Sequence, residues 1–322
     1  MFQRAPWRDV DGDDVVLFDV VPGHGEPVAG TILGRLGEVF GLKIYENGYS
    51  LRYLIEVLEK GFSDSPTEFL HHRQMLSVEF VPAGELTKPD REFLRAMGHR
   101  VSPSTGTLQL RIGRPGFADW YPTEEEGQRL LYFLEAVVWL GETHGPAQLS
   151  ALADRPKWPC VRRVESGGFR LDWMSRPQPP AEKEEPTVIP PRELIDELTQ
   201  LKNLRGGGGP VLEMEIVNTS LRVGRPSERP GFTTVMLIVD AQSGAVLKPE
   251  LFAASDAAGP HMVRIFADFA RKIRACPVEV RHYGSLTPMK PLFDAVGIRL
   301  QKCSSLPAFG AAMDGLMKFL EG

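Results

Sequence analysis

The sequence predicts two domains of mixed class: an N-terminal α+β domain and a C-terminal α/β domain with a mixed sheet. The 322 residues exceed the roughly 250–300 at which a single core stops growing, and 42% of them are hydrophobic. A proline-rich stretch, SRPQPPAEKEEPTVIPP at 175–191, separates two differently ordered regions. We therefore expect domains at 1–174 and 210–322, with 192–209 forming a bracing helix and a glycine-rich connector.

Three short apolar segments open the N-terminal region and suit a meander of strands: VVLFDVV, PVAGTILG and FGLKIYE. SLRYLIEVLEKG then has helical periodicity, with Ser50 as its expected N-cap. In the next helix, Ser65 is the expected cap and Pro66 the first helical residue, with Glu68 completing a capping box. The strand LSVEFV follows.

Two further helices carry capping boxes. TKPDREFLRAMG pairs Thr87 with Asp90 and is expected to end at Gly98, and TEEEGQRLLYFLEAVVWLG pairs Thr123 with Glu126. Acidic residues in its first turn suit the helix dipole, and no histidine stands at ligand spacing, so no metal is predicted there. The residues expected on the buried face of this long helix are Leu130, Leu131, Leu134, Val137 and Val138.

After the linker, RELIDELTQLKNL has an apolar helical face, made of Leu194, Ile195, Leu198 and Leu201. RGGGGP then runs into a strand pattern and lacks the Lys-Ser/Thr of a phosphate loop, so a flexible connector is predicted.

The C-terminal region has the order of a three-strand meander followed by helix, strand, helix, strand and helix. The segments are LEMEIVN, TTVMLIVD, AVLKPEL, a helix at 262–275, VEVRHYG, LTPMKPLFDAVG, IRLQKC and a helix from Ser305. Asp240 and Gly244 mark a hairpin turn between the second and third strands. Right-handed crossovers after the meander predict a mixed sheet flanked by helices.

This order resembles a ribonuclease H-like core. The whole chain also resembles an uncharacterised bacterial family of two-domain proteins with domains of unknown function. The matching stretches are VFGLKIYENGYSLRYL, LQLRIGRPGFADWYPTEEEGQRLLYFLEAV, VMLIVDAQSGAVL and RHYGSLTPMKPLFDAVGIRLQKCSSLPAF. None of them carries a known reaction, so the family resemblance implies architecture only.

The ribonuclease H resemblance implies acids in the first strand, in the first helix and at the end of the fourth strand, where they would hold two metal ions. Glu213 and Glu215 suit the first position and Asp268 the second. The fourth strand ends instead with Arg281, His282 and Tyr283, and a positive group there would repel a metal. The C-terminal domain is therefore expected to be degenerate.

Asp268 has a structural explanation as well. Arg264, Asp268 and Lys272 are spaced four residues apart, which predicts a salt-bridge ladder on one helix face. His282 is either an anion-binding group or base, or a histidine hydrogen-bonded at the sheet edge.

Three functions compete. The leading one is a non-catalytic protein that binds a protein or a nucleic acid, and the missing acid of the fourth strand favours it. Binding is expected at the interdomain cleft or at the carboxyl end of the sheet, where open sheets place ligands. The expected surface is Arg281, His282 and Tyr283. The alternative is a metal-dependent nuclease or phosphoester hydrolase that uses Glu215, Asp240 or Asp268. The third is a small-molecule-binding protein, for which no fingerprint exists. No cofactor or metal is predicted.

Net charge and cysteine content bear on the expected binding partners and the cellular compartment. The net charge of −5 divides into +3 over residues 205–322 and −8 elsewhere, less basic than most nucleic-acid-binding proteins. Cys160, Cys276 and Cys303 are scattered and suit neither a disulfide framework nor a zinc site. The charged N-terminus does not resemble a signal peptide, and LLYFLEAVVWLG falls short of the ~20 residues that span a bilayer. A reducing cytoplasm, without a membrane partner, is predicted.

Two similar segments, LRIGRPGF at 110–117 and LRVGRPSERPGF at 221–232, raise the question of a repeated functional loop. Proline followed by glycine suits the centre of a type II turn. Different elements follow the two copies, so we expect repeated turn chemistry rather than a repeated site.

Overall fold

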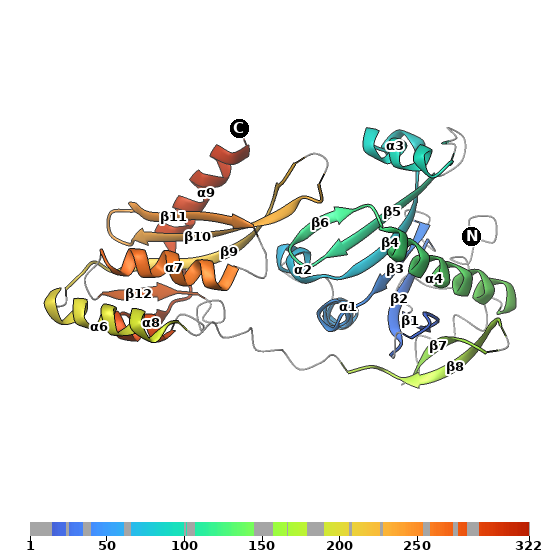
Figure 1. Cartoon of the computed structure of the whole chain (residues 1–322), viewed down its shortest axis with the longest axis horizontal. Coiled ribbons are helices and arrows are strands. Elements are labelled where there is room, and N and C mark those ends of the chain that lie inside the picture. The colour runs from blue at the N-terminus through green and yellow to red at the C-terminus, as the bar shows by residue number, and fades with distance from the viewer. Residues whose placement is uncertain are drawn as a thin grey trace. The chain divides into compact units, whose positions relative to one another are not determined.

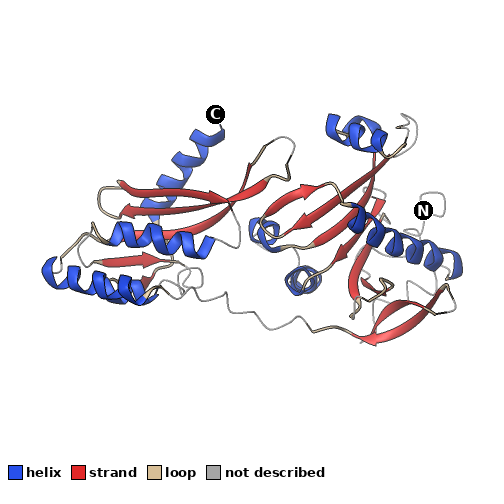
Figure 2. Cartoon of the chain, in the orientation of Figure 1, coloured by secondary structure: helices blue, strands red, loops and turns tan. Residues whose placement is uncertain are grey.

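The computed structural model describes residues 15–23, 26–34, 40–60, 66–99, 101, 107–144, 157–165, 167–178, 190–205, 208–225, 228–253, 258–272, 276–281 and 290–321. The chain forms two compact units, Met1–Pro180 and Ala181–Gly322 (Figure 1). Each unit combines a sheet with packed helices, as Figure 2 shows, which confirms the predicted α+β class. The predicted linker lies largely outside the described residues.

The N-terminal unit contains a sheet in the order β6-β5-β4-β3-β2-β1-β7-β8. Neighbouring strands are antiparallel, except that β1 and β7 run parallel. The strands are β1 (Val15–Asp19), β2 (Val28–Leu33), β3 (Phe40–Tyr45), β4 (Met75–Val81), β5 (Thr107–Arg114), β6 (Phe117–Trp120), β7 (Lys157–Arg163) and β8 (Phe169–Ser175).

Two helices, α1 (Gly48–Lys60) and α4 (Glu124–Thr143), pack on opposite faces of this sheet. The unit also contains α2 (Pro66–His72), α3 (Lys88–Ala96) and a short 3-10 helix at Ala83–Glu85. Successive side chains of a strand point to opposite faces, so Phe18 of β1 packs in the core that includes α4, while Leu17 packs in the core that includes α1. The first strand is therefore buried on both sides.

The capping boxes of α3 and α4 are confirmed, and Gly98 ends the third helix region with a positive φ of 76°. The prediction that Ser50 caps α1 is wrong. The cap is Asn47, whose Oδ1 accepts the backbone N–H of Ser50 at 2.8 Å. The hydroxyl of Ser50 instead accepts the N–H of Gln74 at 2.9 Å, which ties α1 to the start of β4. Asparagine and serine cap equally well, so both positions were available.

The buried face of α4 differs from the predicted one. Leu131 is 46% exposed, and Leu134 and Val138 are only partly buried. The fully buried apolar side chains are Leu130, Phe133, Ala136, Val137 and Leu140. The helix is thus rotated so that Phe133 points into the core, where its ring meets that of Phe18 edge-on at 5.8 Å between ring centroids.

The C-terminal unit has a mixed sheet in the order β13-β12-β9-β10-β11. The strands β9, β10 and β11 form the antiparallel meander, and β12 and β13 run parallel to β9, as predicted. The strands are β9 (Leu212–Val223), β10 (Gly231–Asp240), β11 (Val246–Ala253), β12 (Pro277–Val280) and β13 (Arg299–Lys302).

The helices that flank this sheet among the described residues are α6 (Arg192–Arg205), α7 (Ala258–Ala270), α8 (Lys290–Val296) and α9 (Pro307–Glu321) (Figure 1). The first three share one core with β9, β10 and β12, while α9 packs on the opposite face against β10. The predicted face of α6 is confirmed, with Leu198 fully buried and Leu194, Ile195 and Leu201 partly buried.

The two RPGF segments differ in structure. In the first, Gly116 follows Pro115 with a φ of 77°, as a type II turn between β5 and β6 requires. In the second, Gly231 is the first residue of β10 and has no positive φ, so the predicted turn is wrong there. The hairpin at Asp240 is confirmed, because its Oδ1 accepts the N–H groups of Gln242 and Ser243.

Candidate functional site

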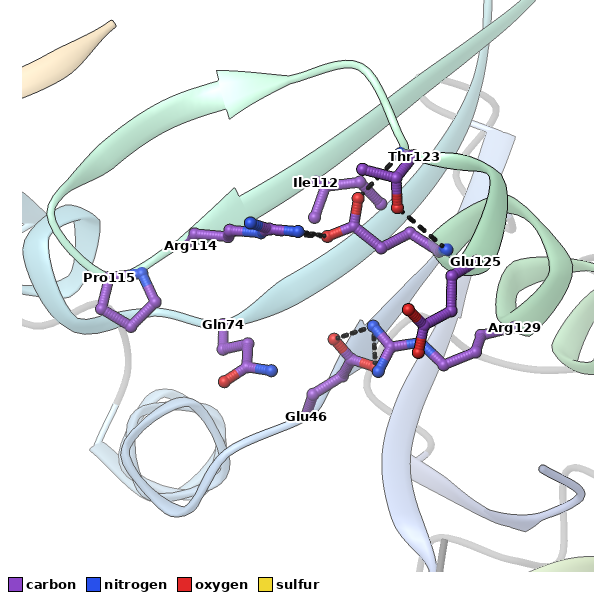
Figure 3. A pocket seen from close by; sticks show the side chains of 9 residues that line it. Glu46, Gln74, Ile112, Arg114, Pro115, Thr123, Glu125 and Arg129 are labelled. Atoms are coloured by element: carbon purple, nitrogen blue, oxygen red, sulfur yellow. Dashed lines mark hydrogen bonds and ion pairs between the residues drawn. The ribbon is translucent and has the colours of Figure 1, made fainter. Parts of the chain in front are cut away.

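A pocket of about 260 Å³ lies in the N-terminal unit at the start of α4 (Figure 3). It forms where the end of β3, the start of β4, the β5–β6 turn and the first turns of α4 meet. The side chains that line it are those of Glu46, Gln74, Ile112, Arg114, Pro115, Thr123, Glu125, Glu126 and Arg129. The segments RIGRPGF and YPTEEEG, which are close in sequence, thus surround one cavity together with the distant segment YENG.

One ion pair of the pocket joins the β5–β6 turn to the first turn of α4. Nε and Nη2 of Arg114 lie 3.0 and 2.6 Å from Oε1 of Glu126. The other oxygen of Glu126 accepts the N–H of Thr123 at 2.8 Å, so the capping glutamate also fixes the arginine. Burial acts to raise the pKa of Glu126, but hydrogen bonds from Thr123 and Arg114 outweigh it and leave the pKa below its ordinary value. Glu126 is therefore anionic at neutral pH.

A second ion pair joins the second turn of α4 to the end of β3. Nη2 of Arg129 lies 3.1 Å from Oε1 and 3.2 Å from Oε2 of Glu46. The side chain of Glu46 is only 3% exposed and that of Arg129 is 24% exposed. Nε of Arg129 is buried and contacts no hydrogen-bond acceptor among the described residues. The guanidinium thus keeps one donor that the described chain does not satisfy.

Two further polar side chains of the lining have no hydrogen-bond or ion-pair partner within the described part of the chain. They are the amide of Gln74 and the carboxylate of Glu125. The backbone of Gln74 is held on both sides, since its N–H donates to Ser50 and its carbonyl accepts the N–H of Glu46. The lining holds two arginines and three glutamates, a formal charge of −1.

The rim of the pocket is held by contacts below the β5–β6 turn. The N–H of Gly116 donates to the carbonyl of His71 at 2.6 Å, and Nη2 of Arg73 lies 2.7 Å from Oδ1 of Asp119. A Cβ at Gly113 would lie 3.2 Å from both Nε of Arg73 and Oδ1 of Asp119, so glycine leaves room for this pair. The turn that carries Arg114 and Pro115 is therefore fixed from two sides.

The residues predicted from the nuclease pattern have other roles. Glu215 of β9 is 3% exposed, and its Oε2 lies 2.7 Å from Nε and from Nη2 of Arg281, at the end of β12. Glu213 is buried too, and its carboxylate accepts the N–H of Phe309 in the first turn of α9 at 2.6 Å. Both glutamates thus have structural partners.

The structure does not bring Glu215, Asp240 and Asp268 together. Glu215 alternates with the β9 residues that pack against α7, so it lies on the α9 face of the sheet, whereas Asp268 is exposed on α7. Asp240 accepts hydrogen bonds in the β10–β11 turn. Among the described residues, no three His, Cys, Asp or Glu side chains are grouped to hold a metal. His282 and Tyr283 lie outside the described residues.

The predicted salt-bridge ladder of Arg264, Asp268 and Lys272 on α7 is wrong, because Arg264 and Asp268 have other partners. Oδ1 of Asp268 lies 2.7 Å from Nη1 of Arg271, three residues on, and Arg271 also contacts Glu197 of α6. Arg264 instead lies 2.9 Å from Nδ1 of His261. The side chains of α7 thus pair along the helix three residues apart, and Arg271 also joins the helix to α6.

The pocket was not predicted from the sequence. Its two ion pairs join residues 12 and 83 positions apart, and no local spacing indicates such pairs. The only local signals are the arginine of the RPG turn, Arg114, and the capping glutamate, Glu126. Each of them has a sufficient structural explanation.

No helix within the described ranges is long and apolar enough to cross a bilayer. No curated protein matches the chain. Residues 1–147 match the family model of a domain of unknown function (DUF7309), and residues 197–317 match that of a second domain of unknown function (DUF6930). The chain thus combines two domains of unknown function, which confirms its predicted resemblance to an uncharacterised two-domain family.

Proposed function

We propose that this protein is a non-catalytic binding protein whose N-terminal unit takes a small polar molecule into the pocket at the start of α4. One observation carries the proposal. The Gln74 amide and the Glu125 carboxylate line one cavity without a partner in the described chain. Small-molecule sites place a few polar groups where they converge on one cavity, so this pair suits a ligand with complementary groups.

The pocket is also pre-organised. The pairs Arg114–Glu126 and Arg129–Glu46 hold its walls on three different elements before any ligand arrives. A preformed site loses little conformational freedom on binding, which favours affinity. The volume of about 260 Å³ falls just below the range of roughly 300–1,000 Å³ typical of sites for drug-sized ligands. A small ligand fits best.

The lining supports binding rather than a reaction. Its nine residues include no cysteine, serine or histidine, and the hydroxyl of Thr123 accepts the N–H of Glu126 in the capping box. Two of its three glutamates are held in ion pairs. Nucleophilic catalysis needs an activated nucleophile beside a base, and this lining offers none.

For the C-terminal unit we propose a degenerate ribonuclease H-like domain that binds a protein or a nucleic acid near Arg281. The strand order β11-β10-β9-β12-β13 supports this interpretation. The ion pair of Arg281 with Glu215 occupies the place where the nuclease pattern needs an acid, which disfavours metal-dependent cleavage. We propose the cytoplasm as the compartment, since all three cysteines are free thiols.

The test of the binding function uses the tryptophans, all five of which lie within residues 1–180. Unfolding followed by tryptophan fluorescence therefore reports on the N-terminal unit. We expect at least one cationic, zwitterionic, neutral or anionic metabolite to stabilise this unit, by about 2.7 kcal/mol at a hundred times its Kd. Gln74→Ala should weaken the response, and Gln128→Ala, on the exposed side of α4, should not. Equal responses of both variants, or no stabilisation by any class, would contradict the proposal.

A further inference from the structure

The C-terminal end of α9 exposes apolar side chains. The helix packs against β9 and β10 through a core that includes Phe309, Met313 and Leu316. Phe319 and Leu320 follow Leu316 by three and four residues, so they lie on the same side of the helix. Phe319 is nevertheless 80% exposed and Leu320 is 39% exposed. Figure 1 shows the reason, because this end of α9 extends past the edge strand β11.

The edge strand β11 carries a bare apolar strip on the same face of the sheet. Leu251 pairs with Val235, and Pro249 pairs with Leu237. Paired residues of neighbouring strands point to the same face, so Leu251 and Pro249 lie beside residues that α9 covers. Leu251 is nevertheless 41% exposed, and Pro249 is exposed as well. Among the described residues, the core beneath α9 includes no side chain of β11.

The charged residues beside this surface point away from it. Lys248 and Glu250 alternate with the residues of the strip, so they lie on the opposite face, where Nζ of the lysine is 2.6 Å from Oε1 of the glutamate. Asp314 and Lys318 stand two residues before and two residues after Leu316, so they point to the opposite side of α9. Exposed apolar patches commonly mark protein interfaces, and homodimer interfaces are more apolar than transient ones. The surface therefore suits an uncharged, apolar partner.

A proline limits how a partner can be held at β11. Proline inside a strand is confined to edges where its nitrogen faces outward, so Pro249 offers no N–H to a further strand at the free edge. A partner therefore cannot extend the sheet along the whole of β11, and it must cover the face of the strand instead. Strand addition at a free edge can continue from copy to copy, whereas a contact of this kind stops at one partner.

We propose that two copies of the chain form a dimer about a two-fold axis through this surface. The surface supplies both halves of such an interface, namely the projecting end of α9 and the bare strip of β11. In a two-fold contact each half meets its complement on the other copy. The end of α9 then lies on the strip of the second copy, where Phe319 contacts Leu251 of the partner subunit. Arg281 follows β12, on the other side of β9 and β10, so this contact is separate from the binding surface proposed above.

Size-exclusion chromatography of the full chain with light scattering measures the mass in solution. We expect twice the mass of one chain. A chain that stays monomeric at about 100 µM would overturn the proposal, because interfaces of standard size have dissociation constants in the micromolar range or below.

Substitutions on both halves of the surface locate the contact. Phe319→Lys and Leu251→Glu each place a charge in the interface. Because a substitution appears twice in a two-fold dimer, each should raise the dissociation constant at least about a hundredfold. Leu131→Lys is the matched control, since Leu131 is 46% exposed on another helix, α4, and should leave the dissociation constant unchanged. Equal effects of the two lysine substitutions would overturn the proposal.

Mixing the Phe319→Lys and Leu251→Glu variants tests the reciprocal contact. In a heterodimer the new lysine of one chain meets the new glutamate of the other, while the second contact keeps the native phenylalanine and leucine. We therefore expect two variants that are each monomeric to form dimers when they are mixed, which also shows that both are folded. A mixture that stays monomeric would overturn the contact between the end of α9 and the strip of β11.

Discussion

The ion pair between Arg129 and Glu46 leads to an asymmetric prediction for stability. The carboxylate of Glu46 is 3% exposed, whereas the guanidinium of Arg129 is 24% exposed and borders an open pocket. Removing the arginine leaves a buried carboxylate without its guanidinium partner. Removing the carboxylate charge leaves a guanidinium that can reach water. The first change should therefore cost more free energy of unfolding than the second.

The magnitudes follow from these exposures. Breaking a buried pair by removing one partner commonly costs roughly 3–5 kcal/mol. Because water can enter the adjacent pocket, we expect Arg129→Met to cost about 3 kcal/mol, at the lower end. Glu46→Gln should cost about 1–2 kcal/mol, the range for a partly hydrated group that loses its partner. In the double variant neither charge is left without a partner. Its loss of unfolding free energy should therefore be well below the sum of the losses in the two single variants.

Urea denaturation followed by tryptophan fluorescence measures these losses, because all five tryptophans lie in the N-terminal unit. The two single variants and the double variant complete a thermodynamic cycle that isolates the interaction between the side chains. A cost below about 1 kcal/mol for Arg129→Met would place the pair among ordinary surface ion pairs. That result, or equal costs for both single variants, would refute the argument that this pair is buried and holds the pocket wall.

Three more substitutions test the packing of the N-terminal unit, all by the same fluorescence. Asp90 is almost fully buried; burial acts to raise its pKa, but hydrogen bonds from Thr87 and Arg111 outweigh this and lower it. The stability that this carboxylate contributes is thus complete above its ordinary pKa of about 3.9 and is lost as pH falls through its lower folded pKa. Asp90→Asn should be less stable than the wild type at pH 7, and its free energy of unfolding should fall less between pH 5 and 3. An equal fall in both proteins would contradict this. Gly41→Ala would push a Cβ into the carbonyl oxygen of Val78 and should destabilise the unit by about 1–3 kcal/mol. In Gly127→Ala the new Cβ meets no atom within 4 Å, so this substitution should stabilise α4 by roughly 0.5–1 kcal/mol. Similar effects of the two substitutions would contradict the packing of β3 against β4.

The correct predictions were those that depend on neighbouring residues. The boxes Thr87–Asp90 and Thr123–Glu126 each need only a spacing of three residues, and both are present. The mixed sheet of the C-terminal unit was expected from a meander followed by right-handed crossovers, and it is present. Local chemistry and chain topology therefore specify most of the fold.

The errors arose where tertiary contacts decide between equivalent local choices. Asn47 and Ser50 are both good caps, and the choice falls to Asn47 because Ser50 holds the start of β4. Leu131 has the same periodicity as a core residue, but the position of Phe133 against Phe18 turns it toward solvent. Long-range packing selects among such alternatives. The contacts involved cannot be recognised from local patterns in a single sequence.

The candidate site was harder to predict for the same reason. The sequence directed attention to acids of the C-terminal region, because a known catalytic pattern requires them there. The pocket depends instead on contacts such as Arg129 with Glu46, which are far apart in the chain. Arg114 and Glu126 each have a local structural role that explains their presence, so nothing in the sequence indicated an ion pair between them.

The most direct test of the pocket is a methyl NMR titration of the full chain labelled at its isoleucine δ1 carbons. Ile112 lines the pocket and is 1% exposed, while Ile238 lies in the core of the C-terminal unit and serves as the control. The compound that most stabilises the N-terminal unit should shift the Ile112 resonance saturably and leave Ile238 unchanged. Stabilisation without any shift of Ile112 would place the ligand elsewhere and contradict the proposed site.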